Sequence, residues 1–334
     1  MQVDAQPVRW GIVSTAGINQ RVLPEVRESP QVELLAVASR SQESADRYAA
    51  QEGIPRAHGS YEALLADEDV EAVYIPLPNS MHVEWTLKAL EAGKHVLCEK
   101  PMSRRAAEVE RAFDAAARVG RILSEGFMYR HHPQSRQAKE LVEAGEIGEL
   151  RVLRASFGFT LGRAGDVRLS ADLDGGSLMD VGCYCVSGTR LFAGEPEIAI
   201  GRQVVGPSGV DVRFTGTLVF PGDLLAHFDC GFDVPGNSLL EAVGSRGTLR
   251  IPRPFLIGEP AIELLRDGEV EPVEVPAADS YRLEFEDVSA AIRGDGEPLL
   301  GRDDAVGQAR AIEALYASAG RGGEPVPCAE VGDG

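Results

Sequence analysis

The chain has 334 residues, 44% of them hydrophobic, with 33 basic and 52 acidic side chains for a formal net charge of −19. This length suits two domains with separate cores, and the acidic balance argues against a nucleic-acid-binding protein or one that lies on an anionic membrane. No apolar stretch reaches membrane-spanning length and the N-terminus lacks a signal-peptide pattern, so we expect a cytoplasmic protein with no membrane partner.

Strand and helix alternate over the first 125 residues. Apolar runs predict five strands, at Val8–Ser14, Val32–Ser39, Ala72–Pro76, His95–Cys98 and Arg121–Glu125. Helices are predicted between them at Asn19–Glu28, Gln42–Glu52, Tyr61–Ala66, Met81–Ala92 and Arg105–Val119. Strands joined by crossover helices form a parallel, doubly wound sheet, so residues 1–125 are predicted to be a Rossmann dinucleotide-binding domain.

From residue 126 to residue 334 the pattern changes to mostly strands. They are predicted at Leu150–Phe159, Glu197–Val205, Val212–Phe220, Leu224–Phe232, Ser238–Gly244 and Thr248–Ile251. Helices are predicted at Gln134–Glu143, Ser177–Phe192, Tyr281–Arg293 and Asp303–Ala319, and the tail Gly320–Gly334 is predicted to be loosely ordered. We therefore expect an α+β domain with a large, mostly antiparallel open sheet that binds substrate and drives oligomerisation.

The turn after the first predicted strand lies where a dinucleotide fold holds pyrophosphate. In register with the usual GxGxxG pattern stand Ser14, Ala16 and Asn19, so the fingerprint is degraded. Small residues still allow close approach, and backbone N–H groups at the start of the next helix can hold a phosphate. The predicted cofactor contacts are Ser14, Thr15, Ala16, Gly17 and Ile18; the alternative is an ordinary small-residue turn.

The end of the second predicted strand indicates which cofactor is used. An NAD site usually presents an acid here for the ribose 2′-hydroxyl, whereas this chain presents Ser39 and Arg40, followed by Ser41 just before a helix. A guanidinium, hydroxyls and a helix N-terminus suit a phosphate. We therefore expect NADP in preference to NAD, the alternative being a solvated arginine beside an N-cap serine.

Two further segments lie at the carboxyl ends of predicted strands, where ligands bind to such sheets. One is the loop with Pro76, Leu77 and Asn79 that leads to His82 at a helix start. The other is Glu99-Lys100-Pro101, in which a proline ends the strand directly after two charged residues. All of these except Pro101 are predicted cofactor contacts, and the plain alternative for Glu99 and Lys100 is a surface ion pair.

Four stretches together resemble the Gfo/Idh/MocA (glucose-fructose oxidoreductase / inositol dehydrogenase) family. They are Ile75–His82, Glu99–Pro101, Glu125–Arg130 and Gly175–Tyr184. The chain looks most similar to the branch of NADP-dependent dihydrodiol and D-xylose dehydrogenases and keto-sugar reductases. This resemblance implies that Lys100 is catalytic and precedes a cis-proline, that Asp180 and Tyr184 complete the site, and that the open sheet forms a homodimer or homotetramer.

The implied chemistry suits these residue types. Oxidation of a secondary alcohol requires a group that accepts the hydroxyl proton, and Tyr184 can do so if the ammonium of Lys100 lowers its pKa from about 10. Asp180 precedes Tyr184 by four residues, which on a helix places both on one face, where Asp180 would hold a sugar hydroxyl or Lys100. Without the resemblance, Asp180 is an acid at a helix start and Tyr184 a core aromatic.

The expected function is therefore hydride transfer between NADP and a secondary alcohol or ketone of a sugar, polyol or cyclic diol. A non-catalytic NADP-binding regulator and an NAD-dependent glycoside hydrolase are the alternatives, and the sequence leaves open the substrate, the direction, and whether Tyr184 or Lys100 transfers the proton. Tyr129 and Arg130 are further candidates for substrate contact. The five scattered cysteines and the adjacent His131 and His132 show no metal-ligand spacing, so no metal is expected.

Overall fold

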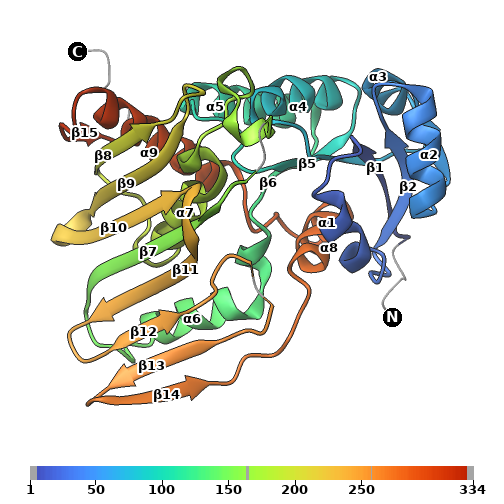
Figure 1. The fold of residues 1–334 in the computed structure, drawn as a ribbon. Coiled ribbons are helices and arrows are strands. Elements are labelled where there is room, and N and C mark those ends of the chain that lie inside the picture. The colour runs from blue at the N-terminus through green and yellow to red at the C-terminus, as the bar shows by residue number, and fades with distance from the viewer. Residues whose placement is uncertain (1–5, 163–164, 257, 329–334) are drawn as a thin grey trace. The chain divides into compact units, whose positions relative to one another are not determined.

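The computed structural model describes residues 6–162, 165–256 and 258–328 (Figure 1). These residues form two compact units. The first unit comprises residues up to Ser103, 107–131 and 279–306, and the second comprises 104–106, 132–278 and the residues from Gly307 on. The predicted boundary assigned all of 126–334 to the second domain, whereas the segment 279–306 packs within the first unit.

The first unit contains a six-stranded parallel sheet in the order β3-β2-β1-β4-β5-β6. Its strands are β1 (Val8–Val13), β2 (Val32–Ala38), β3 (Arg56–His58), β4 (Ala72–Ile75), β5 (His95–Glu99) and β6 (Leu123–Gly126). Its helices include α1 (Asn19–Val26), α2 (Gln42–Glu52), α3 (Tyr61–Leu65), α4 (His82–Glu91) and α5 (Ala106–Val119), with 3₁₀ turns η1 (Asn79–Met81) and η2 (Met128–His131). The strand order reverses between β1 and β4, which confirms the doubly wound sheet and creates a switch point at their carboxyl ends.

Helix α8 (Ser280–Ile292) completes the core of the first unit. The ring of its Phe285 lies 4.7 Å from that of Trp10 on β1 and 5.3 Å from that of Tyr74 on β4, measured between centroids. The indole N–H of Trp10 donates to the hydroxyl of Ser289 at 3.2 Å. A segment that lies far along the chain thus buries the largest side chain of β1.

The second unit contains a nine-stranded sheet in the order β14-β13-β12-β11-β7-β10-β9-β8-β15, antiparallel except between β7 and β10. Its strands are β7 (Leu150–Thr160), β8 (Ile198–Val205), β9 (Asp211–Phe220), β10 (Leu224–Gly231), β11 (Asp233–Gly244), β12 (Thr248–Ile251), β13 (Ile262–Arg266), β14 (Glu269–Val273) and β15 (Val326–Pro327). It also holds α6 (Pro133–Glu143), α7 (Cys183–Ala193), most of α9 (Arg302–Gly320) and the 3₁₀ turns at Val167–Leu169, Ala171–Leu173 and Pro221–Asp223. This is the predicted mostly antiparallel open sheet.

The two faces of this sheet differ in side-chain character. Helix α7 packs against β7, β10 and β11, and alternate residues on that face are buried. On the opposite face, directly paired residues form an apolar row across five strands, consisting of Ile198, Val219, Leu225, Val152 and Val243. The neighbouring row carries ion pairs: Glu241 pairs with Arg154 and Arg250, and Arg250 also pairs with Glu263. Leu225, at the centre of the apolar row, is 44% exposed.

Several predicted elements required correction. The hairpin of β13 and β14 was missed, although Asp267 and Gly268 between them have positive φ angles of 54° and 85°, as a tight two-residue turn requires. The tail is ordered as far as the structure describes it, because β15 pairs with β8 and Cys328 is buried; residues 329–334 lie outside the described part. In the described residues no helix is both long and apolar enough to cross a membrane.

Candidate active site

The turn between β1 and α1 keeps the backbone shape of a dinucleotide-binding turn without its glycines. Ser14 has a φ of 149°, a conformation that favours glycine. Its hydroxyl accepts from the N–H of Ala16 and donates to the carbonyl of Pro76, each at 3.2 Å. The amide of Asn19 donates to the carbonyl of Ser14 at 2.9 Å. Side-chain hydrogen bonds therefore hold this turn and join it to the end of β4.

Three backbone donors in the turn are available to a ligand. The N–H groups of Thr15, Gly17 and Ile18 have no hydrogen-bond partner among the residues that the structure describes. They lie at the N-terminal end of α1, where the peptide dipoles favour a negative group. The predicted turn residues therefore fit a pyrophosphate group.

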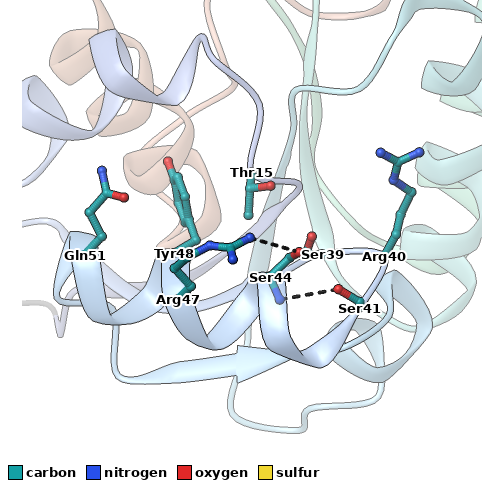
Figure 2. Close-up of a pocket in the computed structure, with 8 residues that line it drawn as sticks. All are labelled: Thr15, Ser39, Arg40, Ser41, Ser44, Arg47, Tyr48 and Gln51. Atoms are coloured by element: carbon teal, nitrogen blue, oxygen red, sulfur yellow. Dashed lines mark hydrogen bonds between the residues drawn. The ribbon is translucent and has the colours of Figure 1, made fainter.

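A pocket of about 390 Å³ lies between this turn and α2 (Figure 2). Its lining residues are Thr15, Ser39, Arg40, Ser41, Ser44, Arg47, Tyr48 and Gln51. None of these side chains is a carboxylate. Arg40 is exposed and makes no hydrogen bond or ion pair with any other described residue, so its guanidinium is available. Ser41 caps α2 by accepting from the N–H of Ser44 at 3.3 Å.

The pocket contains a second arginine that the sequence analysis missed. The guanidinium of Arg47 lies beside Ser44, with one of its nitrogens 3.5 Å from the Ser44 hydroxyl (Figure 2). Arg40 lies at one end of the pocket, beyond Ser41. Arg47 also pairs loosely with Glu43 at 3.8 Å. The missed signal is the helical spacing of Ser44, Arg47, Tyr48 and Gln51, which places four polar side chains on one face of α2.

Glu99 holds the loop that carries Lys100. Its Oε1 accepts from the hydroxyl of Tyr74 at 2.6 Å, and its Oε2 accepts from the N–H of Lys100 at 3.1 Å. The Lys100–Pro101 peptide bond is cis, as the resemblance implied. The N–H of Met102 donates to Glu125 at 2.6 Å. Contacts on both sides of Lys100 thus fix its backbone within the first unit.

His82 holds two loops rather than presenting its ring to a cofactor. One ring nitrogen lies 2.9 Å from the carbonyl of Pro101 and the other 2.7 Å from that of Leu77, and the side chain is 1% exposed. Burial, aided by the nearby charge of Lys100, lowers the pKa of His82 to about 4, although the two carbonyls oppose this shift. The ring is therefore neutral near pH 7 and has a single N–H, which can donate to only one of the two carbonyls, while both nitrogens face protein carbonyl groups. Asn79 begins the 3₁₀ turn η1 that precedes it.

In the second unit, the predicted helix Ser177–Phe192 begins with a π-helical turn. This turn spans Leu178–Gly182 and includes Asp180, and α7 follows with Tyr184 in its first turn. The N–H of Cys183 bonds to the carbonyl of Leu178, five residues earlier. The assumption of regular α-helical spacing between Asp180 and Tyr184 is therefore wrong, because one widened turn separates them.

Tyr184 is held by aromatic neighbours. Its ring lies 5.6 Å from that of Phe157 and 5.5 Å from that of Phe255, between centroids, and the residue is 4% exposed. Asp180 is partly exposed and lies 3.6 Å from a guanidinium nitrogen of Arg168. Arg168 in turn makes two bonds of 2.9 Å to the carboxylate of Asp166. The motif therefore presents a rigid phenol and an acid that is paired with an arginine.

The remaining candidates have structural partners. Arg130 pairs with Asp304 at 3.3 Å, and Tyr129 is 1% exposed within the first unit. His131 approaches Asp287 at 3.3 Å, whereas His132 caps α6. No group of three or more His, Cys, Asp or Glu side chains in the described part of the chain is arranged to hold a metal ion.

Comparisons with known proteins place this architecture in a family. Residues 8–127 match the oxidoreductase family with an NAD-binding Rossmann fold, and residues 135–250 match the Gfo/Idh/MocA C-terminal domain. The chain belongs to the Gfo/Idh/MocA oxidoreductase family. The predicted family and fold class are thus confirmed.

Three relatives of this Gfo/Idh/MocA protein are informative. An NADP-dependent D-xylose 1-dehydrogenase from Haloferax volcanii is 40% identical over 319 residues, which cover 94% of this chain and 98% of that one. The crystal structure of a 3-ketoreductase from Actinomadura kijaniata with NADP and TDP-benzene superposes with a TM-score of 0.88 at 34% identity, covering 93% and 98% of the two chains. An aldose-aldose oxidoreductase from Caulobacter crescentus, solved with glycerol, gives 0.89 at 29% identity, covering 96% and 99%.

Proposed function

We propose that the chain is an NADP-dependent oxidoreductase that interconverts a secondary alcohol and a ketone, or the equivalent anomeric carbon, on a sugar, polyol or cyclic diol. The observation that carries this proposal is the α2 pocket, which has two guanidiniums and three serine hydroxyls and no carboxylate. The NADP 2′-phosphate needs such donors, whereas the NAD ribose needs an acid. The D-xylose dehydrogenase and ketoreductase relatives, which use or bind NADP, support it.

Residues of the first unit would hold the cofactor. The N–H groups of Thr15, Gly17 and Ile18 suit the pyrophosphate, and Arg40 and Arg47 suit the 2′-phosphate. When bound, the nicotinamide supplies or accepts a hydride. The protein must then position the substrate carbon and move one proton at its oxygen.

We propose that Tyr184 transfers this proton and that Lys100 stabilises its phenolate and orients the substrate oxygen. Tyr184 is rigidly packed, and Glu99 and His82 fix the loop that carries Lys100. Structures of the Actinomadura kijaniata ketoreductase include variants with a lysine changed to alanine and a tyrosine changed to phenylalanine. Those two residues are separated by the same number of positions as Lys100 and Tyr184, which supports assigning the same pair here.

Asp180 is proposed to bind a substrate hydroxyl. Its partner Arg168 also pairs with Asp166, so the three groups together carry more negative than positive charge. A neutral polyhydroxylated substrate suits this charge better than an anionic one. Neither a regulator nor a glycoside hydrolase gains support from the relatives, which are named as dehydrogenases, reductases or oxidoreductases.

The test is turnover of a panel of aldoses, polyols and cyclic diols, D-xylose included, followed by the absorbance of reduced nicotinamide with NADP or NAD. We expect turnover with NADP and a clear preference over NAD. Removal of one charged phosphate contact in Arg40→Ala or Arg47→Ala should weaken NADP binding by roughly ten- to a hundredfold and leave NAD binding nearly unchanged. Equal affinity of the wild type for the two cofactors would contradict the proposed pocket function.

A further inference from the structure

A buried carboxylate lies behind the motif that carries Asp180 and Tyr184. Asp211, the first residue of β9, is 3% exposed. Its Oδ2 accepts from the hydroxyl of Ser177 and from the N–H of Leu178, each at 2.7 Å. These two donors are the residue before the π-helical turn and the first residue of that turn. Asp211 therefore fixes the point at which the turn begins.

The other oxygen of this carboxylate binds to helix α9. Asp211 Oδ1 accepts from the hydroxyl of Tyr316 at 2.8 Å. The Tyr316 ring is covered by the guanidinium of Arg104, whose carbon lies 4.6 Å from the ring centroid. Arg104 also pairs with Asp174 at 2.5 Å, just before the Gly175-Gly176 pair. Both ends of the segment that enters the π-helical turn are thus held by one network within the second unit.

A steric constraint shows how closely the carboxylate is fitted. Gly176 has a φ of 128°, and a Cβ added there would lie 2.2 Å from Asp211 Oδ1 and 3.1 Å from the Tyr316 hydroxyl. Any larger residue would displace the carboxylate from the turn. The glycine of the family-like motif is therefore required by Asp211 and Tyr316 rather than by a ligand.

We propose that Asp211, with Tyr316, is a positioning residue for catalysis: it sets the π-helical turn so that the Tyr184 phenol is held in its reactive geometry. This inference rests on the proposed function, in which Tyr184 transfers the proton. Two hydrogen bonds from the start of the turn to this buried carboxylate, and a third from Tyr316 that holds the carboxylate itself, restrain the position of the turn. Displacement of a reacting group by about 1 Å is enough to lower a rate by roughly a hundredfold.

The experiment compares Asp211→Ala with Asp211→Asn, which retains one acceptor oxygen. With D-xylose and NADP, or the panel member that is turned over, Asp211→Ala should lower kcat at least tenfold, change KM less than about threefold and leave NADP affinity unchanged. Asp211→Asn should recover part of kcat. In the Tyr184→Phe background, Asp211→Ala should cost less than about threefold more, because no phenol remains to be positioned. Equal losses in both backgrounds, or a kcat within twofold of wild type, would overturn the proposal.

A matched control separates positioning from loss of stability. Ser318→Ala removes a buried hydroxyl two residues further along α9 that bonds to the N–H of Gly201 and the carbonyl of Glu324, away from the turn. It should lower the melting temperature and leave kcat unchanged. If Asp211→Ala does not fold, Tyr316→Phe is used in its place. Tyr316→Phe should lower kcat by less than Asp211→Ala, and this loss should also disappear in the Tyr184→Phe background. Should Tyr184→Phe itself keep wild-type turnover, the proposed role of Tyr184 fails, which is a separate result.

Hydrogen exchange gives a readout that needs no substrate. In Asp211→Ala the amides of residues 178–184 should exchange faster than in wild type, whereas in Ser318→Ala they should not. Unchanged exchange in this segment would show that the turn holds its shape without Asp211, and the proposal would then be wrong.

Discussion

Ser14 adopts a backbone conformation with positive φ that glycine adopts more easily than any other residue. Its φ of 149° costs an L-residue about 1–3 kcal/mol, and its two hydroxyl hydrogen bonds offset part of that strain. Ser14→Ala should therefore be destabilising, since it loses the bonds and keeps the strain. Ser14→Gly should be more stable than Ser14→Ala by about 1–2 kcal/mol, because glycine adopts this φ freely. Urea unfolding of the two variants measures the difference, and the reverse order would show that the turn is unstrained.

A second prediction concerns Tyr184 and Lys100. Tyr184→Phe should lower kcat by a factor of about 10²–10⁴ with little change in NADP affinity, because only the proton-transfer group is lost. Lys100→Met should be at least as damaging, and the double variant should be far less impaired than the product of the two losses. The measurements are kcat and cofactor affinity for the three variants. If only Lys100→Met is inactive, the lysine transfers the proton and the tyrosine lines the pocket.

Individual site residues could be predicted where the type of the residue and its place in the fold together indicate one kind of ligand. Arg40 beside Ser39, with no acid at the end of that strand, predicted a phosphate pocket, and the structure places both residues in the lining of a pocket. Arg47 was missed because it lines the pocket only if its face of α2 borders that pocket, and the sequence does not show which face does. The carbonyl neighbours of His82, at Leu77 and Pro101, could not be foreseen, because they belong to loops whose approach no local pattern encodes.

Among the elements, the loops joined by His82 should respond to pH. Because burial lowers the pKa of His82 from 6.5 to about 4, the unfolded state binds a proton more readily than the folded one between these values. Stability is therefore complete above about pH 6.5 and is lost as pH falls toward 4, by about 2 kcal/mol between pH 7 and pH 5. His95, whose pKa burial also lowers to about 4, adds to this slope.

The check is the free energy of unfolding of the wild type and of His82→Gln from pH 7 to pH 5. The variant should be less stable at pH 7 and should show a shallower decline. An equal slope in the two proteins would exclude His82 as the titrating group.

Most elements could be predicted because their periodicity is local, and the exceptions have identifiable causes. β3 is only three residues long, and β15 only two, so neither shows alternation. The π-helical turn at Leu178–Gly182 has no local sequence signal, and the side chain that bonds to its first residues, Asp211, lies more than 30 positions further along the chain. The β13–β14 hairpin, in contrast, had a visible Asp-Gly signal at its turn.

For the whole molecule, we predict a two-fold dimer through the open face of the nine-stranded sheet. The apolar row centred on Leu225 runs across five strands, which is more than scattered surface residues would give, and a second copy can cover it. Light scattering at micromolar concentration should give a dimer or a dimer of dimers. Leu225→Arg should dissociate it, whereas Val119→Arg, at an exposed site on α5, should not. A monomeric wild type would refute this assembly.

The position of α8 in the chain also has a consequence for synthesis on the ribosome. β6 ends at Gly126, and the helix that covers Trp10 and Tyr74 begins only at Ser280. At 5–20 residues per second, roughly 150 intervening residues take about 8–30 s to translate. During that interval the nascent Rossmann sheet lacks the helix that packs against Trp10 and Tyr74. A fragment that ends at the last strand of the sheet therefore lacks part of its own core, and the first unit becomes complete only after its last segment, residues 279–306, has been made.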